Sequence, residues 1–430
     1  MTGKLGSEAL PHRAFHPIRQ TPLALHSPSK GSSLPFFVAW LLIVVLLMQL
    51  MRTIEVDAYE LTTSRTDLLG YLLTLILGLF LIQYGLRRRS VLIGQTLVFT
   101  VMFFYIAFVM ILTDPTTSLA SAFISRHGFF PWFWIGMSTA LALEQFAMRS
   151  QLGVLRWQKL SLIAIIVLVC ALAISFSFRS IQDLSYTRSY QSLASNAMIL
   201  ILILLMLVEA VSGQRKSVLL MAIVLTTGTY LVSAIALLQS TSIVGFWFTV
   251  LLFQILLFLG TVRFMQQLLF VAVVTAGTAI FVFSDIFELI VSGTRFKTLF
   301  DGSGQFSPLE SRLMILGSFE DQFAVGPIFG NFRAEVLSGA GLGNYVHSIP
   351  LSMLTHTGLI GFSIMTFGLV LVFLPLRQFR SHHALDQSTL AYAVAISAIG
   401  SLFAFMTWTV FWFMLGAACK RPLLAKMKRV

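Results

Sequence analysis

The sequence is divided into long apolar runs that are separated by short polar gaps. Each run is close to the length of about 20 residues that an α-helix needs to cross a bilayer core. The runs lie at about 34–51, 68–86, 91–112, 129–148, 160–178, 194–212, 217–238, 243–262, 268–284 and 348–375, followed by a longer stretch at about 388–418. Only 11% of the 430 residues are charged, against about 25% in a soluble domain, which excludes an ordinary soluble protein.

The stretch at 388–418 decides the expected topology, because it is too long for one pass and short for two. With the N-terminus inside, a hairpin turning near Phe403 to Thr407 leaves 20 of the 29 Lys and Arg residues inside, as the positive-inside rule favours. Backbone polar groups must be paired within lipid, so every pass should be helical. We therefore expect an all-α polytopic integral membrane protein with about twelve transmembrane helices and both termini in the cytoplasm.

This topology divides the chain into five parts. They are a basic cytoplasmic tail at 1–33, helices one to nine at 34–284, an outer loop at 285–346, helices ten to twelve at 347–418, and a second basic tail at 419–430. The net charge of +12 arises in the short gaps between apolar runs, which is a membrane topology signal, so we expect no nucleic acid partner. Two cysteines, Cys170 and Cys419, offer no disulfide framework and no metal pattern.

The outer loop concentrates polar residues, with seven of the 17 acidic ones. Ser307, Pro308 and Glu310 form a helix start, and the helix should run over about 308–323, before Gly326 and Pro327 end it. Its apolar residues share one face at helical spacing, which predicts a short amphipathic helix on the membrane surface; they are Leu309, Leu313, Leu316, Phe319 and Phe323. Arg312 at the edge of this face would lie at headgroup depth, where it could hold a lipid diphosphate or simply snorkel to phospholipid.

A histidine follows the loop at the predicted start of helix ten. At about 100° per residue, Gly358 falls about 20° from His347 and Gly361 about 40° from it, so a continuous helix would place a glycine notch below this histidine. Such a notch permits close approach of a helix or a lipid chain, and His347 could serve as a general base. His356 falls on the opposite face and is interpreted as a packing or hydrogen-bonded residue. The glycines at 339, 341 and 343 could bind an anion or form a flexible turn.

The spacing His347-Ser348-x9-Gly358-x2-Gly361 resembles a motif of the O-antigen ligase and polymerase superfamily. Ser311-Arg312 and Gly326-Pro327-Ile328-Phe329-Gly330 resemble the stretch that precedes the histidine in that superfamily. Arg188 with Asn196 resembles the Arg and Asn of an earlier outer loop, and the resemblance covers about 180–375.

The resemblance implies a GT-C-like, metal-independent, inverting glycosyltransferase that needs no cofactor. Its donor would be a glycan on undecaprenyl diphosphate at the periplasmic face of the bacterial inner membrane. His347 would be the catalytic base, and Arg188, Arg295 and Arg312 would hold the diphosphate. Transfer onto another lipid-linked repeat unit would make the protein a polymerase for O-antigen or exopolysaccharide, with a chain-length regulator as a possible partner. Transfer onto lipid A core would make it a ligase.

Other classes of protein stay open. A flippase or transporter for lipid-linked glycans should place ionisable groups deep in its helix bundle and show internal repeats. Only Glu144 and Glu209 fall inside the apolar runs, both near cytoplasmic ends, and no clear repeat is visible. Glu55 and Asp57 in the first outer loop could bind a divalent cation, but two carboxylates supply only part of the six or more oxygen ligands that a hard cation takes. A purely structural subunit is the remaining alternative.

Overall fold

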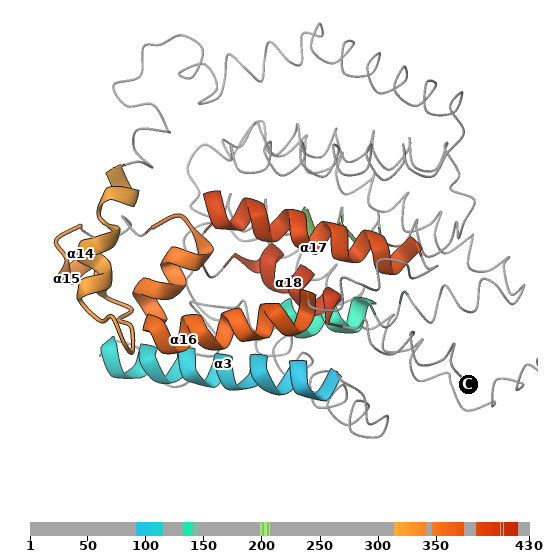
Figure 1. Cartoon of the computed structure of the whole chain (residues 1–430), viewed down its shortest axis with the longest axis horizontal. Coiled ribbons are helices and arrows are strands. Elements are labelled where there is room, and N and C mark those ends of the chain that lie inside the picture. The colour runs from blue at the N-terminus through green and yellow to red at the C-terminus, as the bar shows by residue number, and fades with distance from the viewer. Residues whose placement is uncertain are drawn as a thin grey trace, which may run out of the picture.

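A computed structural model describes part of the chain: residues 92–114, 132–140, 143, 198–199, 202–203, 206, 314–340, 346–373, 384–404, 406 and 408–419. Within these ranges regular structure is entirely helical, with no strand, which confirms the all-α class for the part described (Figure 1). Both basic tails beyond these limits, the remaining apolar runs and the full number of helices lie outside the described residues, so the expected count of twelve stays a prediction.

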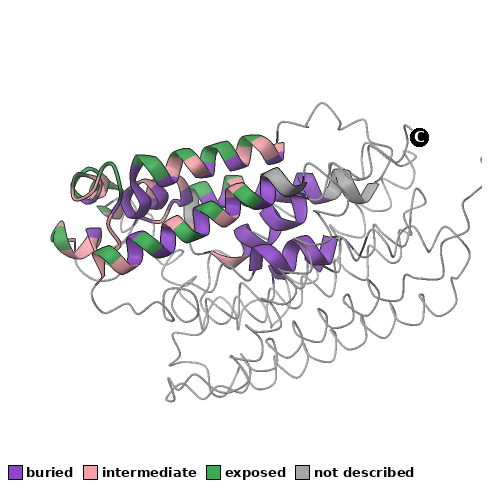
Figure 2. Ribbon diagram, turned by 90° about the horizontal axis from the view of Figure 1, so that it is seen from below, coloured by how far each residue is buried: buried purple, intermediate pink, exposed green. Residues whose placement is uncertain are grey.

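Two of the described helices have the length and composition to cross a membrane. They are α3 (Leu92–Thr113) and α16 (Ile349–Phe373), which confirm the runs expected at 91–112 and 348–375 as helices. At 1.5 Å per residue, 22 residues of α3 extend about 33 Å, close to a bilayer core. Within the apolar stretches of α3 and α16, only 44% and 39% of the residues, respectively, are buried inside the protein. Apolar side chains therefore cover much of the outer surface of both helices, as Figure 2 shows for the exposed residues.

The helices α3 and α16 run side by side because small residues let them approach closely (Figure 1). A Cβ atom added to Gly368 would lie 2.8 Å from the ring of Phe99, so this ring packs directly against the glycine. One helical turn further, the side-chain amide of Gln95 donates a hydrogen bond of 3.0 Å to the carbonyl of Leu371. The start of α3 thus lies beside the end of α16, which makes the pair antiparallel.

The last apolar stretch is two helices, α17 (Ala384–Phe403) and α18 (Thr409–Ala418), which pack against each other. The predicted break near Phe403 to Thr407 is therefore confirmed. The second helix is shorter than a membrane pass, however, because it begins only after the extended residue Trp408 and contains ten residues. The link is held by Met406, whose carbonyl accepts from the Trp412 indole at 2.6 Å and whose amide donates to Ser352 Oγ at 3.0 Å.

An aromatic core joins α3, α18 and the helical residues 132–140, which fall in the run expected at 129–148. The ring of Phe133 lies 4.8 Å from Phe99 and 5.8 Å from Phe103, and Phe103 lies 5.2 Å from Trp412, all between centroids. A Cβ on Gly416 would overlap the carbonyl oxygen of Phe133, so α18 contacts this helical segment through backbone.

The helix expected at 308–323 is interrupted in its described part. Residues 314–317 are helical, the chain turns at Ser318, and α14 (Phe319–Ala324) follows. The turn forms because the Ser318 hydroxyl and amide both donate to the carbonyl of Ile315. The end before Gly326 and Pro327 is as predicted. The side chain buried in α14 is polar Gln322, while the apolar residues Met314 and Leu316 are exposed.

Candidate functional site

The most unusual backbone in the described residues is a break inside α16 at Gly358. This residue has φ 62° and ψ −170°, a conformation that only glycine adopts without strain, and it divides α16 into 349–357 and 359–373. A Cβ at Gly358 would overlap the carbonyl of Ile328, so the residue is also required to be small. The break turns the first half of α16 away from α3 (Figure 1).

The expectation that His347, Gly358 and Gly361 share one continuous helix face is wrong. His347 lies in a bend two residues before α16 begins at Ile349, and the break at Gly358 ends the helical register. The two glycines do permit close approach, but protein fills the space. The 326–332 segment of the loop contacts Gly358, and Tyr105 of α3 would lie 3.0 Å from a Cβ at Gly361.

Backbone carbonyls of the 326–332 segment accept hydrogen bonds from the first amides of the half-helix that begins after the break. The amide of Leu359 donates to the carbonyl of Pro327 at 2.9 Å, and the amide of Ile360 donates to the carbonyl of Ile328 at 3.2 Å. Both amides would otherwise lack the helical partners that a continuous helix supplies. The loop and the second half of α16 are therefore joined as one unit.

The other end of the break is joined to the same segment. The amide of Asn331 donates to the carbonyl of Thr355 at 3.1 Å. The hydroxyl proton of Tyr105 is shared between the carbonyls of Phe329 at 3.0 Å and Thr357 at 3.1 Å. One tyrosine on α3 thus ties together the loop and the end of the first half of α16.

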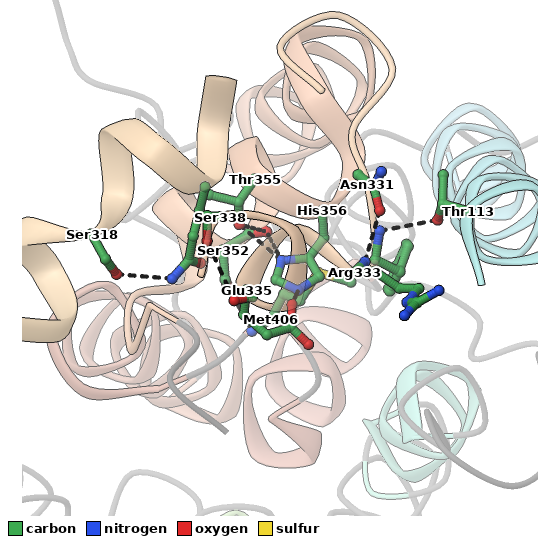
Figure 3. A network of polar contacts seen from close by, with 12 residues as sticks. Thr113, Ser318, Asn331, Arg333, Glu335, Ser338, Ser352, Thr355, His356 and Met406 are labelled. Atoms are coloured by element: carbon green, nitrogen blue, oxygen red, sulfur yellow. Dashed lines mark hydrogen bonds and ion pairs between the residues drawn. The ribbon is translucent and has the colours of Figure 1, made fainter. Parts of the chain in front are cut away.

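A polar cluster centred on His356 lies on the N-terminal side of the break, which we call above it (Figure 3). This imidazole is buried, and its Nδ1 lies 2.9 Å from the carbonyl of Ser352 and 2.8 Å from Oγ1 of Thr355. A carbonyl can only accept, so Nδ1 carries a proton. The prediction that His356 is a packing or hydrogen-bonded residue is confirmed.

The second ring nitrogen of His356 faces a carboxylate of the loop. Its Nε2 lies 3.6 Å from Oε2 of Glu335 on α15 (Ala334–Leu337), and Phe332 packs edge-on against the imidazole at 5.3 Å between centroids. The separation of 3.6 Å is an ion-pair distance and too long for a direct hydrogen bond. A protonated His356 would satisfy Ser352 and Glu335 together.

The environment of Glu335 favours its charged form. Burial by itself raises the pKa of this carboxyl, but the neighbouring His356, a backbone amide and the charge of Arg333 outweigh burial, and the pKa falls below its ordinary value of 4.5. The pair therefore joins the loop to the first half of α16, while the carbonyl contacts join it to the second half.

His347 lies near this cluster in the sequence and at the head of α16. It is half-buried, between the buried residues Val346 and Ser348, and the amide of Ser352 donates to the carbonyl of Ser348 at 2.7 Å, which starts the helix. The imidazole is thus neither fully exposed nor enclosed. That placement suits a group that must exchange a proton with a bound molecule.

The expected diphosphate ligands Arg188, Arg295 and Arg312 lie outside the described residues, as does Asn196. In the glycine-rich stretch only residues up to Ala340 are described. The described part of the chain contains no group of three or more His, Cys, Asp and Glu side chains that could hold a metal.

Three residues that join the loop to the helices were not singled out by their sequence pattern. Tyr105 lies in a long apolar run, and Asn331 and Glu335 lie in a polar loop where such residues are ordinary. Their partners are far away in the sequence, so periodicity carries no signal for them. The small residues Gly326 and Gly330, which form the tight turn at 2.8 Å from amide to carbonyl, were visible as a pattern.

The described fold is that of an all-helical protein with two helices of membrane-spanning length and a loop packed into a helix break. No known family profile, curated protein sequence or solved structure matches the chain.

Proposed function

We propose that this protein is a multi-pass glycosyltransferase of the inner membrane that polymerises glycans carried on undecaprenyl diphosphate. The observation that carries the proposal is the position of His347. A half-buried imidazole precedes the first half of α16, next to the polar loop, within the motif spacing to Gly358 and Gly361. In the proposed topology this end of α16 faces the periplasm, where a lipid-linked glycan would present its reacting sugar and its diphosphate.

The proposed chemistry needs a base and a group that stabilises the leaving diphosphate. His347 accepts the proton of an acceptor hydroxyl as the hydroxyl oxygen attacks the anomeric carbon of the donor sugar. The bond from that carbon to the diphosphate oxygen breaks, with inversion, and the lipid diphosphate leaves. Arg188, Arg295 and Arg312 would offset the negative charge that grows on the leaving oxygen, for which bidentate guanidinium groups are suited.

Broken helices like α16 also occur in transporters, where the ends of the two half-helices bind substrates near the bilayer midplane. In this protein the amides freed at Leu359 and Ile360 are bonded to carbonyls of Pro327 and Ile328, so this half-helix end is occupied by the protein itself. That difference favours the enzyme over the flippase or transporter, which remains the alternative class. A ligase acting on lipid A core is the alternative within the enzyme class.

The test is a surface-glycan gel of the host strain carrying His347→Ala in place of the natural protein. Loss of long chains, with the variant present at normal abundance in the membrane, is the expected result. Glu320→Ala, which changes an exposed residue of α14, is the matched control and should keep full-length chains. Full-length glycan in the His347→Ala strain would remove the proposed base.

A deletion strain distinguishes the branches of the proposal. A single repeat unit on lipid A core indicates an O-antigen polymerase. Naked core with accumulated lipid-linked polymer indicates a ligase. Loss of secreted polymer alone indicates an exopolysaccharide polymerase, and unchanged glycans of every kind would overturn the proposal.

A further inference from the structure

The 326–332 segment lies beside the C-terminal part of α3. Its amide at Phe332 donates to Thr113 Oγ1 in the last turn of α3 at 3.0 Å, and its carbonyl at Phe329 accepts from Tyr105. Tyr105 precedes Thr113 by eight residues, or about 12 Å of helix. The segment therefore lies along the last turns of α3 and returns at Gly330 toward α15.

Along the last turns of α3, the 326–332 segment replaces α16 as the neighbouring part of the chain. Below the break, Gly368 and Leu371 of α16 contact α3 at Phe99 and Gln95. Above the break, the first half of α16 leaves α3, and the 326–332 segment fills the position along the last turns of α3. A non-helical segment in this position must satisfy its own backbone groups.

The first four carbonyls of the segment are paired in this way. Four successive carbonyls, from Gly326 to Phe329, each accept a hydrogen bond; the donors are the Gly330 amide, the Leu359 amide, the Ile360 amide and the Tyr105 hydroxyl. No charged side chain occurs between Asp321 and Arg333. A segment on a watery surface would need neither feature, because water would pair its carbonyls.

Two apolar side chains of the segment, Ile328 and Phe329, point away from the protein. Ile328 and Phe329 are 55% and 61% exposed, although their backbones are held by α3 and α16. Leu359 and Ile360, whose amides bond to the segment, are also exposed apolar residues, as is Phe104, which precedes Tyr105 on α3. Exposed apolar side chains therefore lie on the segment and on both helices that hold it.

We propose that the 326–332 segment is a re-entrant element whose residues Ile328 and Phe329 contact the acyl chains of the outer leaflet. The occupant of this surface is bilayer lipid, because the surface continues the exposed apolar faces of both helices of membrane-spanning length. Asp114, the first charged residue after the apolar run of α3, marks the level of the water boundary. The inference rests on the membrane location that the proposed function assumes and on none of its chemistry.

The experiment measures the environment of a nitroxide spin label on the full chain in phospholipid vesicles. Labels are attached at Phe329→Cys and, separately, Ile328→Cys, with Cys170 and Cys419 replaced by alanine. Phe104→Cys on the same level of α3 is the lipid reference, and Glu320→Cys is the water reference. The expected result is collision with dissolved oxygen and loss of collision with a water-soluble nickel chelate at 328 and 329, as at 104.

Two results would overturn the proposal. Nickel collision at 328 and 329 equal to that at 320 would place the segment in water. Weak collision with both reagents would place the side chains against protein. His347→Ala should leave the collision pattern unchanged, so failure of the catalytic proposal and failure of the lipid contact are separate outcomes.

Discussion

The imidazole of His356 and the carboxylate of Glu335, 3.6 Å apart, join the outer loop to the first half of α16. Both side chains are largely removed from solvent, and His356 also bonds to its own helix through Ser352. The loop is thus attached on both sides of the Gly358 break. On the N-terminal side the contact is the His356–Glu335 pair, which is an ion pair when the imidazole is protonated, and on the C-terminal side it is the carbonyl contacts.

Removing one member of the ion pair should destabilise the protein without acting on the chemical step. For Glu335→Gln we expect a loss of about 1–3 kcal/mol, because the partner is left buried and incompletely satisfied. Thermal unfolding of purified protein in detergent measures the loss. Glycan synthesis per folded molecule should be retained, in contrast to His347→Ala, and abolished synthesis at normal stability would contradict the structural role of the pair.

The same pair should make stability depend on pH in a definite direction. Because the folded protein lowers the pKa of Glu335 below 4.5, its contribution is fully present above that value. The contribution is lost as the pH falls through the folded-state pKa, when the carboxyl gains a proton beside His356 and Arg333. Unfolding temperatures recorded against pH should therefore drop less steeply on acidification for Glu335→Gln than for the natural protein, and parallel curves would argue against the shift.

Gly358→Ala should be severely damaging. The added methyl group would meet the Ile328 carbonyl, and an L-residue at φ 62° and ψ −170° costs about 1–3 kcal/mol in strain alone. We expect reduced abundance in the membrane and a lower unfolding temperature. Gly317→Ala is the matched control, because nothing lies within 4 Å of its added Cβ, and it should be close to neutral. Equal behaviour of the two variants would refute the break.

Tyr105→Phe removes one oxygen atom that two carbonyls share. We expect a loss of about 0.5–1.5 kcal/mol, because the carbonyls of Phe329 and Thr357 lose the donor that they share. Proteolysis of the loop in membrane vesicles offers the measurement, since the 326–332 segment should become more susceptible. An unchanged cleavage rate would show that the tyrosine does not hold the segment.

Arg312→Lys should leave glycan synthesis poor if this residue holds the lipid diphosphate in the proposed way. A lysine keeps the charge but lacks the planar fork that pairs with two phosphate oxygens. Chain length on a surface-glycan gel is the measurement, with His347→Ala as the inactive reference. Normal chains would indicate attraction by charge alone, and activity that disappears with EDTA would favour the metal-dependent alternative.

Helical class and helix positions could be predicted because they follow from local patterns. Apolar runs of the right length locate α3 and α16 within a few residues. The end of the loop helix before Gly326 and Pro327 follows from residues that cannot continue a helix. For all of these the physical cause lies within about 20 residues of chain.

The arrangement around Gly358 could not be predicted, because its causes lie far apart in the sequence. A glycine within an apolar run is compatible with a continuous helix, and the helical wheel through His347 assumed one. What decides otherwise is the supply of carbonyls from Pro327 and Ile328 and of a hydroxyl from Tyr105, which together replace the hydrogen bonds that the break removes. The sequence alone determined that the chain is helical and where its apolar helices run. Only the tertiary structure decided where α16 breaks, because a break is stable only when distant groups satisfy its backbone.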